Sequence, residues 1–185
     1  MLHHQIKNLN MYIVRFYGMT QDPETKNYMM ILDYAKNGSL RNYLNTSYNK
    51  LNWEDKLKGL NNIIFGLENI HNYKFIHRDL HIGNILVFPL SASITDMGLC
   101  KPADYNASEN TKNSIYGNLP YIAPEILRGQ SYTKAVDIYS LGFIMSEIST
   151  GQRPFDGLEF NETKLGIKDC NQSLHLELLN VILNC

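Results

Sequence analysis

Two acidic residues and one amide stand close together in the sequence, and their side chains suit phosphoryl transfer. Asp79 and Asn84 are five residues apart, and Asp96 follows Asn84 by twelve residues. This reaction needs a carboxylate near the attacking hydroxyl and oxygen ligands for Mg²⁺, which neutralises the phosphates. Asp79 suits the first role, whereas Asn84 and Asp96 suit the second. Gly98 then lets the backbone turn tightly behind the metal ligand.

The first third of the chain is expected to form a hairpin and then a short helix. Residues 12–17 and 28–34 are rich in β-branched and aromatic side chains, and a turn-rich stretch at 21–27 separates them. Two paired strands are therefore predicted. Gly38 and Ser39 are expected to open the short helix.

Two long helices are predicted in the rest of the chain. Asn52 is a suitable N-cap for the first helix, with acidic residues in its first turn. The second helix, at 135–150, has apolar residues on most sides and is expected to be buried, and Gly151 is a natural stop. Extended segments are predicted at 85–88 and 93–95. Strands followed by helices indicate an α+β fold. The apolar positions predicted along the first helix are Leu57, Leu60, Ile64, Leu67 and Ile70.

The length of 185 residues fits one domain, or one domain and part of another. With 44% hydrophobic and 19% charged residues, the chain can bury a sizeable core. A formal net charge of −1 gives no basic surface, so neither nucleic acid nor an acidic membrane is expected as a partner. No apolar stretch is long enough to span a bilayer and the start of the chain contains no apolar signal region, so a cytoplasmic location is expected. The three cysteines are too few and too scattered for a disulfide framework or a metal site, so reduced thiols are expected.

The residues that carry this chemistry belong to longer patterns, which are H-R-D-L-H-I-G-N at 77–84, D-M-G at 96–98, A-P-E at 123–125 and D-I-Y-S-L-G at 137–142. Through these motifs the chain resembles the eukaryotic protein kinase family. Residues 77–84 contain the complete H-R-D-L-x-x-x-N pattern of the family's catalytic loop. Residues 96–98 match D-F-G with Met in place of Phe, and residues 123–125 match A-P-E. Residues 137–142 match the helix whose Asp holds the catalytic loop in the family. The four motifs occur in the family's order, and the resemblance covers about residues 13–155.

The resemblance implies a bilobal, protein-kinase-like α+β fold. Most of it would be the helical large lobe, at 35–155, with a two-strand remnant of the small lobe at 1–34 and a divergent tail at 156–185. The implied activity is transfer of the γ-phosphoryl group of ATP, with Mg²⁺, to serine or threonine hydroxyls of a protein substrate in signalling. Tyr121 favours this specificity, because tyrosine kinases usually have Trp near that position.

The resemblance also implies roles for individual residues near the nucleotide. Asp79 and His81 would be catalytic. Backbone groups of Asp33 and Ala35 would contact the edge of the adenine, and Leu86 would form the apolar floor beneath the base.

A regulatory site is implied as well. In the family, the Arg at position 78 binds a phosphate on the activation segment, which orders that segment. Ser114 is the expected phosphosite and Thr111 the second choice, with an upstream kinase as a partner. The alternative is that both are ordinary solvated hydroxyls.

Two residues within the motifs depart from the serine/threonine pattern. His81 stands where serine/threonine kinases usually have Lys, and Asn118 stands where they usually have Thr. In replacing both residues the chain resembles the tyrosine-kinase-like group, whose loops vary at these positions. We hypothesise that His81 hydrogen-bonds Asn118 and that Asp79 favours the charged imidazole. The alternative is that His81 points to solvent. His71 is expected to be a surface or packing residue.

Two other functions stay open. The 185 residues contain no G-x-G-x-x-G loop and no V-A-I-K-like strand, so very weak or no turnover is expected, and a non-catalytic fragment that binds partners is the first alternative. The second is a small-molecule kinase of the aminoglycoside or choline type, whose motif also has the form H-x-D-L-H-x-G-N. Such kinases lack an activation segment ending in Ala-Pro-Glu, whereas this chain has one that ends at Glu125.

Overall fold

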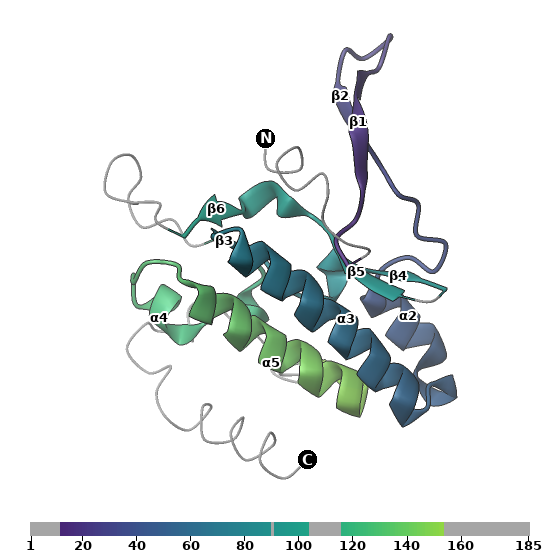
Figure 1. Cartoon of the computed structure of the whole chain (residues 1–185), viewed down its shortest axis with the longest axis vertical. Helices are drawn as coiled ribbons and strands as arrows, with labels where there is room; N and C mark the ends of the chain where they lie inside the picture. The colour runs from purple at the N-terminus through teal and green to yellow at the C-terminus, as the bar shows by residue number, and fades with distance from the viewer. Residues whose placement is uncertain (1–11, 90, 104–115, 154–185) are drawn as a thin grey trace.

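Two long helices pack side by side in the structure, a computed structural model that describes residues 12–89, 91–103 and 116–153, and a β-hairpin projects away from them (Figure 1). The helices and strands are β1 Phe16–Gln21, β2 Tyr28–Leu32, α2 Leu40–Ser47, α3 Trp53–Asn72, β3 Phe75–Ile76, β4 Ile85–Phe88, β5 Ser91–Ile94, β6 Lys101–Pro102, α4 Pro124–Leu127 and α5 Lys134–Thr150. Helices combined with small antiparallel sheets confirm the predicted α+β class. In the described part of the chain, no helix is both long and apolar enough to cross a membrane.

Strands β1 and β2 pair in antiparallel fashion and confirm the predicted hairpin, but the first strand begins later than predicted. It covers Phe16–Gln21, not residues 12–17. Ile13 and Val14 are buried and pair instead with β5, where the Val14 N–H donates to the Ile94 carbonyl at 2.9 Å. The prediction was wrong because these β-branched residues find both backbone partners and a buried environment beside β5.

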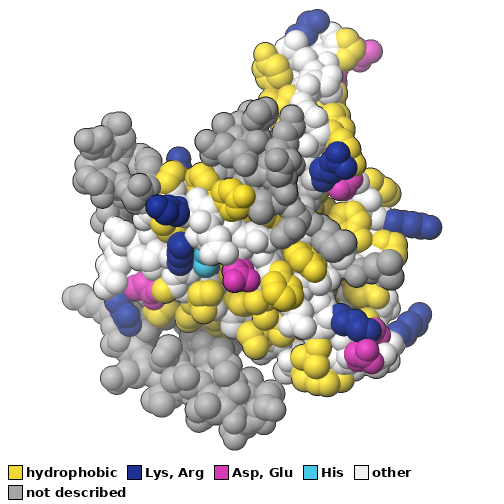
Figure 2. Space-filling model, in the orientation of Figure 1, with side chains coloured by type: hydrophobic (Ala, Val, Ile, Leu, Met, Phe, Trp, Pro, Cys, Tyr) yellow, Lys and Arg dark blue, Asp and Glu magenta, His cyan; other side chains and the backbone are white. Residues whose placement is uncertain are grey.

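The projecting hairpin is exposed over most of its length, and Figure 2 shows hydrophobic side chains on its surface. Its turn is stabilised by Asp22, whose carboxylate accepts the backbone N–H groups of Glu24 and Thr25. The large hydrophobic residues exposed on the two strands are Tyr17, Met19, Tyr28, Met29, Met30 and Ile31. The hairpin therefore contributes little to the core.

Helix α3 begins as predicted, because the Asn52 side chain accepts the Asp55 N–H at 2.8 Å and caps the helix. Its buried face differs in part from the predicted one, since Leu57 is 42% exposed and Ile64 is 37% exposed. The residues buried in this helix are Ile63, Gly66, Leu67 and Ile70. Strand β5 packs along this side of the helix, which decides which apolar residues are covered.

Helix α5 ends as predicted at Gly151, whose φ of +73° provides a left-handed C-cap. The prediction that this helix is buried is confirmed for one face only, because Ile138 and Met145 are exposed. The inward face instead carries buried polar residues, including Asp137 and Glu147. Buried polar groups need hydrogen-bond partners, and the partners of these two lie at the candidate site.

Strands β4 and β5 form an antiparallel pair that contributes buried side chains to the core. Ile85 lies opposite Ile94, and both side chains are fully buried. Strand β4 begins directly after Asn84, and β5 ends two residues before Asp96. The pairing of these strands therefore brings Asn84 and Asp96 to the same edge of the fold.

Candidate active site

The loop at residues 77–84 is held against α5 by the carboxylate of Asp137, which is 1% exposed. This carboxylate accepts the backbone N–H of His77 at 2.8 Å and that of Arg78 at 2.9 Å. It also accepts a hydrogen bond of 2.8 Å from Nε2 of His71. A buried carboxylate without donors would be strongly destabilising, so these three bonds fix the loop on the helix.

His71 was expected to be a surface or packing residue, and its bond to Asp137 gives it a more specific role. The two residues are 66 positions apart in the sequence. No local pattern marks the pair, because the contact exists only once α3 has packed against α5.

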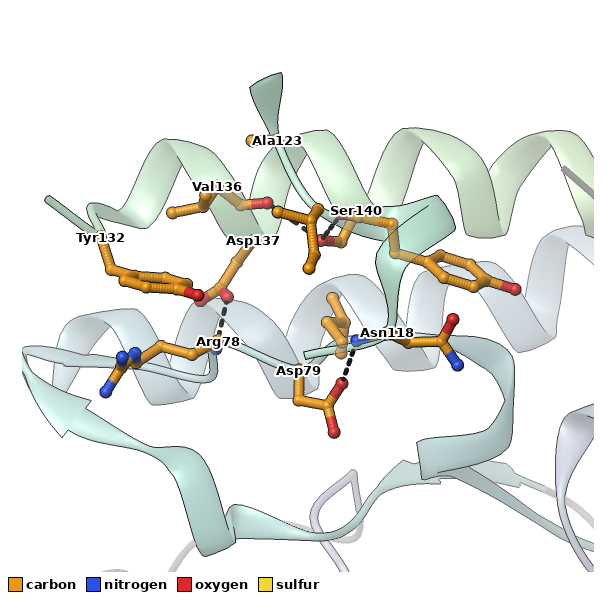
Figure 3. Close-up of a pocket in the computed structure, with 11 residues that line it drawn as sticks. Arg78, Asp79, Asn118, Ala123, Tyr132, Val136, Asp137 and Ser140 are labelled. Atoms are coloured by element: carbon orange, nitrogen blue, oxygen red, sulfur yellow. Dashed lines mark hydrogen bonds between the residues drawn. The ribbon is translucent and has the colours of Figure 1, made fainter. Parts of the chain in front are cut away.

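Asp79 is oriented by two neighbours, of which Figure 3 shows Asn118. Its Oδ1 accepts the backbone N–H of Asn118 at 3.0 Å. Asn84 Nδ2 donates to the carbonyl oxygen of Asp79 at 2.9 Å and to its Oδ2 at 3.2 Å. Each carboxylate oxygen therefore has one neutral donor and retains capacity to accept another hydrogen bond.

Asp96 lies close to Asn84, as the sequence predicts. The N–H of Thr95 donates to the Asn84 carbonyl at 2.9 Å. Asp96 follows in a left-handed conformation with φ of +56°, and its Oδ1 accepts the N–H of Gly98 at 3.3 Å. The three residues chosen from the sequence, Asp79, Asn84 and Asp96, are thus brought together.

The oxygens of this site fit Mg²⁺. Since Asn84 directs its amide nitrogen at Asp79, its amide oxygen has no partner among the described residues. The second carboxylate oxygen of Asp96 likewise has none in the part of the chain that the structure describes. Mg²⁺ in proteins is usually held by one or two such oxygens together with phosphate and water.

His81 differs from both sequence-based expectations. Its Nδ1 accepts the N–H of Gly83 at 3.0 Å, so the ring proton resides on Nε2. Nε2 lies 3.6 Å from Oδ1 of Asp79, too far for a hydrogen bond. The side chain is 14% exposed and does not point to solvent. Among the described residues it has no hydrogen bond to Asn118; the two residues meet at the same carboxylate oxygen instead.

The charged imidazole expected at position 81 is not favoured. Burial lowers the pKa of His81 below 6.5, the nearby Asp79 carboxylate opposes this shift, and Arg41 adds to it. Desolvation therefore outweighs the attraction of Asp79. His81 is neutral at pH 7 and does not supply the positive charge of the Lys that it replaces.

A buried polar network beside His81 was missed from the sequence. The Tyr121 hydroxyl donates to a carboxylate oxygen of Glu147 and accepts a hydrogen bond of 3.2 Å from Arg41. The Tyr121 ring lies 5.6 Å from the ring of His81. Burial and then the Glu147 carboxylate raise the pKa of Tyr121, and burial also raises the pKa of Glu147. This network connects α2, the segment after Asn118 and α5.

Arg78, the expected phosphate-binding residue, has φ of +73° and lies beside the ring of Tyr132. The central carbon of its guanidinium is 4.1 Å from the centroid of that ring. Its Nε is buried and has no hydrogen-bond partner among the described residues. The expected phosphosites, Ser114 and Thr111, lie outside the described residues.

The residues expected near adenine belong to β4 and to the segment between β2 and α2. Leu86 is half-buried in β4 and forms a backbone bridge with Ser39, four residues after the buried Ala35. Asp33 is anchored at the start of β1. Its N–H donates at 3.1 Å to the carbonyl of Arg15, directly before this strand, and its carboxylate accepts the hydroxyl of Tyr17, within the strand, at 2.6 Å. The segment that follows Ala35 therefore pairs with β4 at Leu86.

Comparison with known proteins identifies one family. A protein-family model described as "Protein kinase domain" matches residues 1–181, which includes most of the tail where motifs gave no resemblance. The chain is 34% identical over 152 residues to the probable serine/threonine-protein kinase roco5 of Dictyostelium discoideum, covering 78% of this chain and 5% of the relative.

Two further relatives show the same pattern of coverage. The cysteine-rich receptor-like protein kinase 6 of Oryza sativa subsp. japonica is 36% identical over 147 residues, covering 76% of this chain and 21% of the relative. The serine/threonine-protein kinase PrkC of Bacillus subtilis is 30% identical over 146 residues, covering 78% of this chain and 22% of the relative. The chain therefore spans less than a quarter of each of these three proteins.

Proposed function

The chain belongs to the protein kinase family, and we propose that it transfers the γ-phosphoryl group of ATP to serine and threonine hydroxyls of protein substrates. Two of the relatives carry serine/threonine-protein kinase in their names, which supports this substrate class. The small-molecule kinase alternative lacks such support. The tyrosine-kinase-like grouping rests on His81 and Asn118 alone and stays a prediction.

The observation that carries the proposal is the fixed orientation of the Asp79 carboxylate. Asn118 and Asn84 each donate to one of its oxygens, and the remaining lone pairs can accept the hydrogen bond of a substrate hydroxyl. In the proposed reaction, the hydroxyl oxygen bonds to the γ-phosphorus, the bond to ADP breaks, and the hydroxyl proton passes to Asp79. Such a positioned carboxylate contributes a rate factor of about 10²–10⁴.

We assign the metal ligands to the amide oxygen of Asn84 and the carboxylate of Asp96. Bound Mg²⁺ supplies positive charge that neutralises the phosphates. The adenine contacts are assigned to backbone groups of Asp33 and Ala35, with Leu86 beneath the base. His81 takes part as a neutral side chain beside Asp79, so the site has less positive charge than one with Lys at this position.

We further propose that Arg78 receives a phosphate on Ser114 or Thr111, placed there by an upstream kinase. The buried Nε of Arg78 that has no partner among the described residues supports this assignment. A phosphate oxygen would satisfy it with a charge-assisted hydrogen bond.

The test measures transfer of labelled phosphate from ATP to three peptide libraries whose only hydroxyl is serine, threonine or tyrosine. We expect slow incorporation into the serine and threonine libraries that EDTA abolishes. Asp79→Asn should lower it about a hundredfold, whereas Glu68→Gln, an exposed control on α3, should leave it unchanged. Incorporation that survives Asp79→Asn, or that favours tyrosine, would refute the proposal.

A further inference from the structure

The Tyr132 hydroxyl forms hydrogen bonds with both the backbone N–H and the backbone carbonyl of Tyr116. It accepts the N–H of Tyr116 at 2.9 Å and donates to the carbonyl of Tyr116 at 2.7 Å. Tyr132 belongs to the loop between α4 and α5. Its side chain therefore links Tyr116, two residues before Asn118, to the segment directly before the N-terminus of α5. Two hydrogen bonds to one residue fix the position of its backbone more closely than either alone.

The anchored residue is only two positions before the contact with Asp79. Gly117 follows Tyr116 and has φ of +112°, a conformation available to glycine. Asn118 comes next, and its N–H donates to Oδ1 of Asp79 at 3.0 Å. Because two residues span about 7 Å at most, the place where Tyr132 holds Tyr116 limits where the Asn118 N–H can lie.

The same ring also contacts the residue before Asp79. The guanidinium carbon of Arg78 lies 4.1 Å from the Tyr132 ring centroid and 5.3 Å from that of Tyr116. Figure 3 shows the Tyr132 ring beside the Arg78 side chain, with the Asp79–Asn118 bond next to them. An arginine stacked on an aromatic face in this way is attracted to the ring.

Tyr132 is also close in sequence to Asp137, the residue that holds the loop at 77–84 against α5. It precedes Asp137 by five residues, and the Asp137 carboxylate accepts the N–H groups of His77 and Arg78. Residues 132–137 thus act on both sides of Asp79. Asp137 positions the backbone of His77 and Arg78, which precede Asp79, and Tyr132 positions the segment that carries the Asn118 N–H, which donates to Asp79.

We infer that Tyr132 is a positioning residue, whose hydroxyl holds Tyr116 so that the Asn118 N–H stays on the Asp79 carboxylate. The two hydrogen bonds between the Tyr132 hydroxyl and the Tyr116 backbone are called the Tyr132 clamp below. The expected effect of Tyr132 on phosphate transfer rests on the proposed function. The expected effect of Tyr132 on the position of the Asn118 N–H is independent of that function.

The test compares Tyr132→Phe, which keeps the ring on Arg78 but lacks the hydroxyl, with Tyr28→Phe, an exposed tyrosine on the hairpin. Residue-resolved amide exchange is followed in both variants and in the wild type. We expect exchange at Tyr116 and at Asn118 to accelerate about tenfold in Tyr132→Phe only, with α3 and α5 unchanged. Equal exchange at Asn118 in all three proteins would overturn the inference. Faster exchange throughout α3 and α5 would also overturn it, because Tyr132 would then be a general folding residue.

Kinetics separate this inference from the proposed function. If the wild type transfers phosphate, Tyr132→Phe should lower kcat several-fold and leave the KM for ATP unchanged. Unchanged kcat together with faster exchange at Asn118 would refute a role in transfer. A wild type without any transfer would refute the proposed function, and the exchange result would still decide whether the clamp exists.

Discussion

The backbone N–H of Asn118 and Oδ1 of Asp79 are joined by a hydrogen bond of 3.0 Å across 39 residues of sequence. Gly117, directly before Asn118, makes this contact possible. Its φ of +112° disfavours any side chain, and a Cβ there would lie 2.9 Å from the Arg78 carbonyl oxygen. The orientation of the proposed catalytic carboxylate therefore depends on a residue without a side chain.

Gly117→Ala should accordingly weaken the Asn118–Asp79 contact. We expect phosphate transfer to fall roughly tenfold to a hundredfold, since small displacements of reacting groups have effects of this size. The strained backbone should also lower the free energy of unfolding by about 1–3 kcal/mol. Gly142→Ala is the matched control, because nothing lies within 4 Å of a Cβ at that position. Transfer assays and urea unfolding of both variants measure the effects, and a Gly117→Ala protein with the wild-type rate would contradict the argument.

The buried His81 predicts a dependence of stability on pH. Its pKa in the folded chain is below the ordinary value of 6.5, so the unfolded chain takes up a proton first as the pH falls. Stability should therefore be lost below about pH 6.5, by at most about 1.4 kcal/mol per pH unit for this group. Above that pH the group contributes no pH dependence.

The measurement compares the wild type with His81→Asn, whose side-chain oxygen can still accept the Gly83 N–H. Urea unfolding between pH 5 and pH 8 should show a shallower decline in the variant at the acidic end. The other histidines titrate in both proteins, so the difference isolates His81. Parallel curves would show that the imidazole is not held neutral by burial.

Tyr121→Phe should destabilise the fold through Glu147. The variant removes the hydroxyl that donates to this buried carboxylate, at an expected cost of about 1–3 kcal/mol in unfolding free energy. Burial already raises the pKa of Glu147 above 4.5, and the Tyr121 hydroxyl opposes that shift. Without the hydroxyl the pKa rises further, so the loss should be larger at pH 7 than near pH 4.5, where the carboxyl is protonated.

Two further variants test whether the destabilisation of Tyr121→Phe arises from the buried Glu147 carboxylate. Adding Glu147→Gln should recover part of the stability at pH 7, because a neutral amide is easier to bury than a carboxylate. Tyr28→Phe on the exposed hairpin should have no effect at either pH. A loss in Tyr121→Phe that is the same at both pH values would mean that Glu147 is not involved.

The parts of the site predicted from the sequence are those encoded locally. Asp79 and Asn84 belong to one short motif, and Asp96 follows after a hairpin whose two strands can be recognised from their composition. The Asn52 cap and the Gly151 stop were predicted for the same reason, since each depends on residues within a turn of itself.

The contacts that were missed join segments far apart in the sequence. His71 finds Asp137 across 66 residues, and Tyr121 finds Glu147 across 26. The strand at Ile13 was assigned to the hairpin because its composition favours a strand but does not specify a partner. Burial decided the charge of His81, and burial depends on the packing of the whole fold.

Two glycines of α3 show how packing separates residues that look alike in sequence. A Cβ on Gly66 would lie 2.7 Å from the Tyr12 carbonyl oxygen and 3.1 Å from the Ile94 side chain, whereas nothing lies within 4 Å of a Cβ on Gly59. The Tyr12 carbonyl accepts the N–H of Ile94 at 2.9 Å. Gly66 thus permits the segment around Tyr12 to pair with β5, which leads directly to Asp96.

Gly66→Ala and Gly59→Ala should therefore have opposite effects. In Gly66→Ala the overpacking should lower the free energy of unfolding by about 1–3 kcal/mol. In Gly59→Ala the better helix propensity of alanine should raise it by about 0.5–1 kcal/mol. Because the displaced β5 would carry Asp96 with it, Gly66→Ala should also weaken the binding of Mg²⁺–ATP, whereas Gly59→Ala should not. Chemical unfolding and nucleotide titration of the two variants measure these effects. If both variants are stabilised to the same degree, β5 does not pack on α3 at Gly66 as the structure has it.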